Sequence, residues 1–311
     1  MSFSFATPVT RGLTFVTIAA VAWGTGGVIA AVLYRTSGLG PVAVSFWRTA
    51  GGVALLAVAH AWRRRGRTPD WVPASERGSR RRRWTIALTT GAGLALYQTA
   101  YYAAVRHSGV AFATLATLGA GPILIAVGAR LSIGERFGGL GLAAVLVAPL
   151  GLVLIAGGGG GGASVAGLVF SLISASGYAV VTVLHRALGG VDPARTTLTG
   201  FVVAGVLLAP FAVWEGLWPT RGVPGETLAL LGYLGAISTA LAYSLFFASL
   251  GAIRAATVSV VTLAEPLTAA AIAVALLGER LTWTLTAGAA ILLAAVVLLA
   301  HGETRRPPDL V

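Results

Sequence analysis

Apolar residues occur along the chain in ten long runs that polar or charged segments separate. A run of roughly 20 mostly apolar residues is long enough to cross about 30 Å of hydrocarbon as a helix. The runs do not alternate apolar with polar residues as membrane strands do, and backbone groups in lipid must be hydrogen-bonded, so we expect helices. The first run exceeds the apolar segment of a signal peptide, so we expect a retained helix. The ten predicted helices are Leu13–Tyr34, Pro41–Trp62, Trp84–Val105, Val110–Ala129, Phe137–Ala156, Val165–Leu184, Thr196–Trp214, Thr227–Leu250, Ala255–Leu277 and Trp283–Ala300.

Composition agrees with a membrane protein. Of 311 residues, 56% are hydrophobic and 10% are charged, against roughly 25% charged in a typical soluble domain. The predicted fold class is an all-α integral membrane protein with about ten transmembrane helices. The chain has no cysteine, lysine or asparagine, which excludes disulfides, thiolate metal sites and the phosphate-binding loop of ATPases.

The net charge of +12 comes from 22 arginines, and these are unevenly distributed. With the N-terminus placed inside, 17 arginines fall in inner segments and 5 in the outer half. Positive residues favour the cytoplasmic side, so we expect both termini there. The cluster Arg80–Arg83 is then a topology anchor near anionic lipid, and nucleic acid is not an expected partner.

Two segments of the chain share one spacing. Gly134–Arg136 and Gly278–Arg280 both read Gly-Glu-Arg and stand 144 residues apart, and the same offset places Pro122 on Pro266. We predict a helix kink at each of these prolines. Five helices repeated once give an inverted repeat, which is typical of secondary transporters. The expected domains are a first five-helix repeat over 1–156, a Gly-rich linker over 157–163, and a second five-helix repeat with a short cytoplasmic tail over 164–311.

These motifs, together with Trp23-Gly24 in the first helix and Arg48 in the second, carry a resemblance. Over essentially its whole length the chain resembles the EamA-type transporters of the drug/metabolite transporter superfamily. The resemblance implies a ten-helix carrier of the bacterial inner membrane, with two inverted five-helix repeats around a central cavity. Such carriers often export amino acids, metabolites or toxic compounds. The chain departs from symmetry at one place, because Glu265-Pro266 in the second half corresponds to Gly121-Pro122 in the first.

Charged side chains inside a membrane are rare, so each is a functional candidate. Glu265 lies near the middle of the ninth predicted helix, where the kink at Pro266 frees backbone carbonyls that can line a polar cavity. The candidate roles of Glu265 are to bind a substrate amine or to carry a proton; the alternative is a carboxyl that only pins a helix contact. Arg48 is a candidate ligand for a substrate carboxylate; alternatively it extends to the outer interface or pairs with an acid.

Aromatic and amide side chains supply further candidate substrate ligands. Gln98 lies beside Tyr97 and Tyr101, which are four residues apart and share a helix face. The predicted walls of a cavity that accepts apolar or aromatic groups are Trp23, Tyr97, Gln98, Tyr101, Tyr178 and Tyr243. The alternative for each is ordinary packing between helices. The histidines do not stand at metal-ligand spacing, so we expect neither a metal nor a cofactor.

The function we expect is secondary transport of a small metabolite by alternating access, in the direction of export. Amino acids or related amphipathic compounds are the best single expectation for the substrate, with proton coupling through Glu265. A passive facilitator or channel is the alternative. A membrane-embedded enzyme is disfavoured because only two acids, Glu215 and Glu226, lie in the predicted outer loop. The expected partners are the substrate and the lipid bilayer.

Overall fold

The computed structural model describes residues 8–64, 80–134, 139–157, 164–188, 193–250 and 261–304. Within these ranges the chain is helical apart from short turns, which confirms the predicted all-α class. The first half contains α1 (Pro8–Thr36), α2 (Pro41–Arg64), α3 (Arg80–Ser108), α4 (Val110–Ile133) and α5 (Gly139–Gly157). The second half contains α6 (Val165–Leu188), α7 (Pro193–Glu215), α8 (Pro224–Gly235), the π-helix η2 (Ala236–Leu241), α9 (Ala242–Leu250), α11 (Ala264–Leu277) and α12 (Trp283–Thr304).

Most helices meet the requirements for a membrane span. In the described part of the chain six helices are long and apolar enough to cross a membrane, with α8, η2 and α9 forming one of them, and three shorter helices are apolar. The helix α3 belongs to neither group. Its mean hydropathy is lowered by Gln98 and by its tyrosines and threonines. Since α3 packs against α1, α2, α4, α6 and α7, much of its polar surface faces protein.

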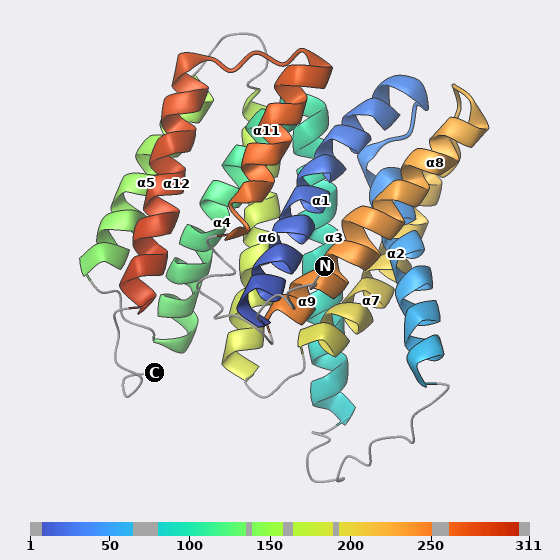
Figure 1. The fold of residues 1–311 in the computed structure, drawn as a ribbon, viewed down its shortest axis with the longest axis horizontal. Coiled ribbons are helices and arrows are strands. Elements are labelled where there is room, and N and C mark those ends of the chain that lie inside the picture. Colours follow the sequence, from blue (N-terminus) through green and yellow to red (C-terminus); the bar gives the residue numbers. More distant parts are fainter. Residues whose placement is uncertain are drawn as a thin grey trace, which may run out of the picture.

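The two halves run in opposite directions through the bundle. Consecutive helices run antiparallel, so α6 runs opposite to α1 (Figure 1). The ends of α4 and α11 are built alike, because Gly134 and Gly278 adopt left-handed φ values of 78° and 70°. Their N–H groups donate to Ala129 O and Ala273 O, which again differ by the offset of the predicted repeat. Glu135, Arg136 and residues 158–163 of the predicted linker lie outside the described residues.

Two of the predicted helices differ from expectation in detail. The eighth contains a π-helical turn, η2, between α8 and α9. The ninth was expected over Ala255–Leu277; its residues 255–260 lie outside the described ranges, and α11 begins only at Ala264, after a turn at Thr262 and Leu263.

The two prolines therefore occupy different places in their helices. Pro266 stands in the first turn of α11, where a proline leaves no helical hydrogen bond unmade. The helical conformation is interrupted at Thr262 and Leu263, shortly before Pro266, and Val261 on the other side of this turn is again helical. Pro122, by contrast, lies inside α4, where it removes an interior hydrogen bond.

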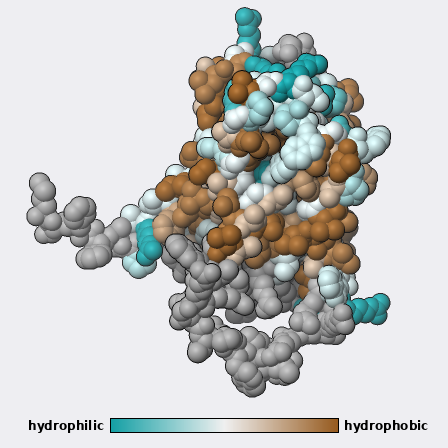
Figure 2. All heavy atoms as spheres, turned by 90° about the vertical axis from the view of Figure 1, so that its right-hand side faces the viewer, coloured by the Kyte–Doolittle hydropathy of each residue, from teal (hydrophilic) through white to brown (hydrophobic). Residues whose placement is uncertain are grey.

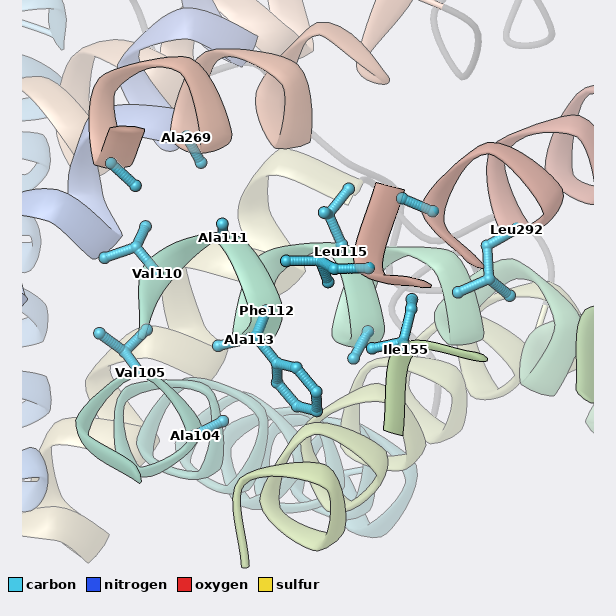
Figure 3. Close-up of a cluster of buried hydrophobic side chains, with 14 of the residues drawn as sticks. Ala104, Val105, Val110, Ala111, Phe112, Ala113, Leu115, Ile155, Ala269 and Leu292 are labelled. Atoms are coloured by element: carbon cyan, nitrogen blue, oxygen red, sulfur yellow. The ribbon is translucent and has the colours of Figure 1, made fainter. Parts of the chain in front are cut away.

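The core of the bundle surrounds α4. Figure 3 shows Val110, Leu115 and neighbouring side chains of α4 against Ile155 of α5, Ala269 of α11 and Leu292 of α12. Outside, large apolar side chains remain exposed, among them Leu146, Val153, Val206 and Phe211. On the face shown in Figure 2, hydrophobic residues cover most of the middle while polar residues gather at the top. Lipid is the solvent that accommodates such a surface.

Candidate functional site

Close contact between α1 and α11 brings Glu265 to the middle of the bundle. A Cβ placed on Gly24 would lie 2.8 Å from Glu265 O and 2.9 Å from Thr268 Cβ, so only glycine fits there. The preceding residue, Trp23, packs its ring against Tyr243 of α9 at 5.1 Å and against Phe246 at 5.3 Å. The Trp23-Gly24 pair thus joins α1 to α9 and α11, which carry Tyr243 and Glu265.

Glu265 is partly buried and is the second residue of α11. Its backbone N–H donates to Thr262 O at 3.0 Å, which closes the turn before the helix. The side chain lies within electrostatic range of Arg48, Tyr97 and Tyr243. Among the described residues none donates a hydrogen bond to its carboxylate. A carboxylate in this position retains its capacity to accept hydrogen bonds from a ligand or to take up a proton.

Two tyrosines within electrostatic range of Glu265 each belong to a group of aromatic side chains. Tyr243 lies between Trp23 and Phe201, with ring-centroid distances of 5.1 Å and 5.0 Å and an edge-to-face arrangement in each case. Tyr97 of α3 contacts Tyr178 of α6 at 5.5 Å. Edge-to-face and tilted geometries of this kind are the favourable ones for aromatic rings.

Two side-chain donors near these rings have no hydrogen-bond partner. They are Trp23 Nε1 and Gln98 Nε2, which are buried and unpaired within the described part of the chain. Gln98 is only 4% exposed, so it cannot turn its amide to bulk solvent. Buried polar groups are nearly always paired, so these two unpaired donors call for an explanation. Tyr101, in contrast, shares a hydrogen bond with Thr114 at 2.8 Å.

Arg48 lies inside the bundle and is 9% exposed, so it does not extend to an interface. Its Nε donates to Thr239 Oγ1 at 2.9 Å, its Nη1 to Tyr102 OH at 2.9 Å, and its Nη2 to Ser238 O at 3.0 Å. The guanidinium also lies 5.8 Å from the centre of the Tyr102 ring. These partners are all neutral, so none of these three hydrogen bonds is the alternative pairing with an acid.

All eight side chains that the sequence singled out as ligands are among the described residues. Seven of them each have a ring contact with another member or lie within electrostatic range of one: Trp23, Arg48, Tyr97, Tyr101, Tyr178, Tyr243 and Glu265. The eighth, Gln98, follows Tyr97 on α3. Sequence reasoning did not single out Ser238, Thr239 or Phe201. The available signal was two consecutive hydroxyl residues in the middle of an apolar run, which is also an ordinary pattern for contacts between helices.

Two acids outside the bundle centre cap helices. Glu279 accepts hydrogen bonds from Val110 N at 2.7 Å and Ala111 N at 2.9 Å, and Glu215 accepts one from Ala43 N at 2.8 Å. Carboxylates are favourable at helix N-termini because they satisfy free N–H groups and complement the helix dipole. In the described part of the chain no group of three or more potential metal ligands occurs.

Comparison with known sequences decides the class of protein. The profile of the EamA-like transporter family matches residues 10–157 and again residues 165–300. The chain belongs to the EamA-like transporter family. This EamA-like transporter is therefore a multi-pass membrane protein with a duplicated repeat and a small-molecule substrate, and it is not an enzyme.

Relatives of this EamA-like transporter cover nearly its whole length. It is 26% identical over 298 residues to the uncharacterized transporter YwfM of Bacillus subtilis (strain 168), an alignment that covers 94% of each chain. A solved crystal structure superposes with a TM-score of 0.62 at 18% identity, over 95% of this chain and 99% of the other. That similarity shows the shared fold.

Proposed function

We propose that this EamA-like transporter is a secondary carrier that exports a small amphipathic metabolite from a bacterial cell. Amino acids are the substrate class that the site suits best. The chain lies in the inner membrane with both termini cytoplasmic, as its arginine distribution favours. Without lysine the chain has no phosphate-binding loop for ATP, so an ion or substrate gradient drives transport.

The observation that carries the proposal is the partly buried Glu265, whose carboxylate has no described hydrogen-bond donor and lies within electrostatic range of Tyr97 and Tyr243. Glu265 binds the amine of the substrate. The rings of Trp23, Tyr243 and Tyr97 contact its apolar part, because aromatic side chains combine a large apolar surface with a polar edge. The unpaired N–H groups of Trp23 and Gln98 donate to oxygen atoms of the substrate.

Tyr101 and Tyr178 complete the proposed wall of the site. Tyr101 belongs to α3, and a Cβ on Gly27 of α1 would collide with its hydroxyl. Tyr178 lies on α6 over Gly121, whose Cβ position is 3.4 Å from the Tyr178 ring. The substrate is thereby held between helices of both halves, as alternating access between inverted repeats requires.

Proton coupling follows from the same carboxylate. Glu265 holds either a proton or the substrate amine, because the ionised form attracts the amine and the protonated form does not. Each cycle then exchanges one proton taken up outside for one substrate molecule released there. A passive facilitator lacks this exchange, and a channel lacks saturation.

The test is substrate flux in proteoliposomes that contain the purified protein. A panel of amino acids and aromatic amines is measured with and without an imposed pH gradient, for wild type, Glu265→Gln and the control Glu226→Gln. Glu226 is an exposed residue of the first turn of α8, so its substitution removes an equal charge far from the site chemistry.

The expected result is saturable flux that the pH gradient accelerates in wild type and in Glu226→Gln but not in Glu265→Gln. Flux that saturates equally in all three proteins and ignores the gradient would establish a facilitator. Flux that rises linearly with concentration would establish a channel.

A further inference from the structure

The π-helical turn η2 leaves one backbone carbonyl outside the helical hydrogen-bond ladder. In an α-helix the N–H of Ala242 would donate to the carbonyl four residues earlier, at Ser238. Here that N–H donates to Ile237 O and Thr239 O instead and bypasses Ser238 O. A π-helical turn inside an α-helix usually marks a functional position.

Arg48 supplies the partner that the turn lacks. Its Nη2 donates to Ser238 O at 3.0 Å and its Nε to Thr239 Oγ1 at 2.9 Å, so one guanidinium binds two successive residues of the turn. The Thr239 hydroxyl in turn donates to Leu234 O at 2.9 Å, five residues earlier. A planar group with donors in a fixed fork is suited to hold two acceptors at a defined separation.

The guanidinium and the turn are fixed from two further helices. Tyr102 of α3 accepts from Arg48 Nη1 at 2.9 Å, and the backbone carbonyl of Tyr102 accepts from Tyr34 OH at 3.1 Å. On the other side, Ser238 Oγ donates to Ala22 O of α1 at 2.9 Å. The turn is thus tied to α1 and, through Arg48, to α2 and α3.

We infer that Arg48 is a positioning residue: it holds η2 in its π-helical form, and η2 sets the face of α9 on which Tyr243 meets Trp23. Each additional residue in a helix rotates the following side chains by about 100°. Relaxation of η2 to α-helical geometry therefore turns Tyr243 away from Trp23 and Phe201. Three of the five guanidinium N–H groups are used in this way, so most of the donors of Arg48 are already engaged within the protein.

The first test measures amide hydrogen exchange of residues 236–243 in the full-length protein in lipid nanodiscs. Arg48→Gln removes the charge, Arg48→Lys keeps the charge without the fork, and Thr239→Val removes one acceptor. We expect exchange in this segment to accelerate about tenfold in both Arg48 variants and less in Thr239→Val. Exchange in α5 (Gly139–Gly157), which makes no contact with this network, serves as the internal control and should not change.

A coupling test separates local positioning from general destabilisation. If Arg48 acts through Thr239, the double variant Arg48→Gln/Thr239→Val exchanges no faster in this segment than Arg48→Gln alone.

A distance measurement tests the orientation of α9. The chain has no cysteine, so spin labels can be attached at Thr17→Cys in α1 and Ser244→Cys in α9, both exposed. We expect the distance between these labels to differ between the Arg48→Gln variant and the labelled protein that retains Arg48.

The inference is overturned if both Arg48 variants leave exchange in 236–243 and the label distance as in wild type. It is equally overturned if exchange accelerates to the same extent in the segment and in α5, because that pattern means a loss of global stability. Neither measurement needs a substrate, so the outcome is independent of the proposed transport function.

Discussion

The corresponding segments Gly121-Pro122 and Glu265-Pro266 show where the two halves of the molecule differ. In α4 the first pair lies inside a continuous helix, and Gly121 packs against the ring of Tyr178. In α11 the second pair begins the helix after a turn. The two helices nevertheless end in the same left-handed glycine cap.

The comparison of the two halves distinguishes residues that pack the helices together from the residue to which we assign the transport chemistry. Features that hold the helices together, such as the glycine caps, are kept in both halves. The carboxylate occurs in one half only, and there the helix is interrupted beside it. Because a charged group inside a membrane is costly unless it has a role, the half that carries Glu265 is the one in which we place the transport chemistry.

The largest expected effect comes from removing and relocating the carboxylate. Glu265→Gln should lower gradient-driven flux at least about tenfold, because the variant lacks the group that exchanges the proton. The double variant Glu265→Gln/Gly121→Glu should not recover, because position 121 faces Tyr178 instead of α1. Recovery of flux in the double variant would contradict the asymmetry.

Alanine should have different consequences at Gly24, which contacts Glu265, and at Gly121, which corresponds to Glu265 in the first half. A Cβ on Gly24 lies under 3 Å from Glu265 O and Thr268, whereas the nearest atom to one on Gly121 is 3.4 Å away. We expect Gly24→Ala to destabilise the protein by about 1–3 kcal/mol through overpacking. Gly121→Ala should be neutral or stabilising, since alanine favours helix by about 1 kcal/mol over glycine. Reversible unfolding in mixed micelles measures both, and equal destabilisation would refute the comparison.

The contact of Glu279 with the start of α4 links the second half to the first. Glu279→Gln should lower the free energy of unfolding by about 1–2 kcal/mol, because two hydrogen bonds from N–H groups to a charged oxygen are weakened. Glu215→Gln should have a smaller effect, since Glu215 accepts only one such bond from the described residues. The same unfolding assay ranks the two variants, and a larger effect at Glu215 would be inconsistent with the capping account.

The smallest effect is expected at Pro266. Pro266→Ala should change the free energy of unfolding by no more than about 0.5 kcal/mol, because the first turn of a helix has no hydrogen bond to regain. Pro122→Ala allows α4 to form an interior hydrogen bond and should change the free energy by more than about 1 kcal/mol. A larger change for Pro266→Ala than for Pro122→Ala would show that the interruption depends on the proline.

Much of the fold was accessible from the sequence, since lipid imposes long apolar runs and the Gly-Glu-Arg spacing reveals the duplication. Glu265 was accessible for the same reason, as a lone acid in an apolar run. Two features were not: the π-helical turn is in contact with Arg48 from another helix, and α11 starts after a turn in which Thr262 O accepts from Glu265 N. Residues that act through contacts distant in sequence, such as Thr239 with Arg48, leave no local pattern to read.

The most direct test of the central claim is proton movement on addition of a transported compound to proteoliposomes that contain a trapped pH-sensitive dye. The account predicts that wild type and Glu226→Gln move protons against the direction of substrate movement, with a saturable dependence on substrate, and that Glu265→Gln moves none. Substrate-dependent proton movement of wild-type size in Glu265→Gln would contradict the assignment of the coupling site to Glu265.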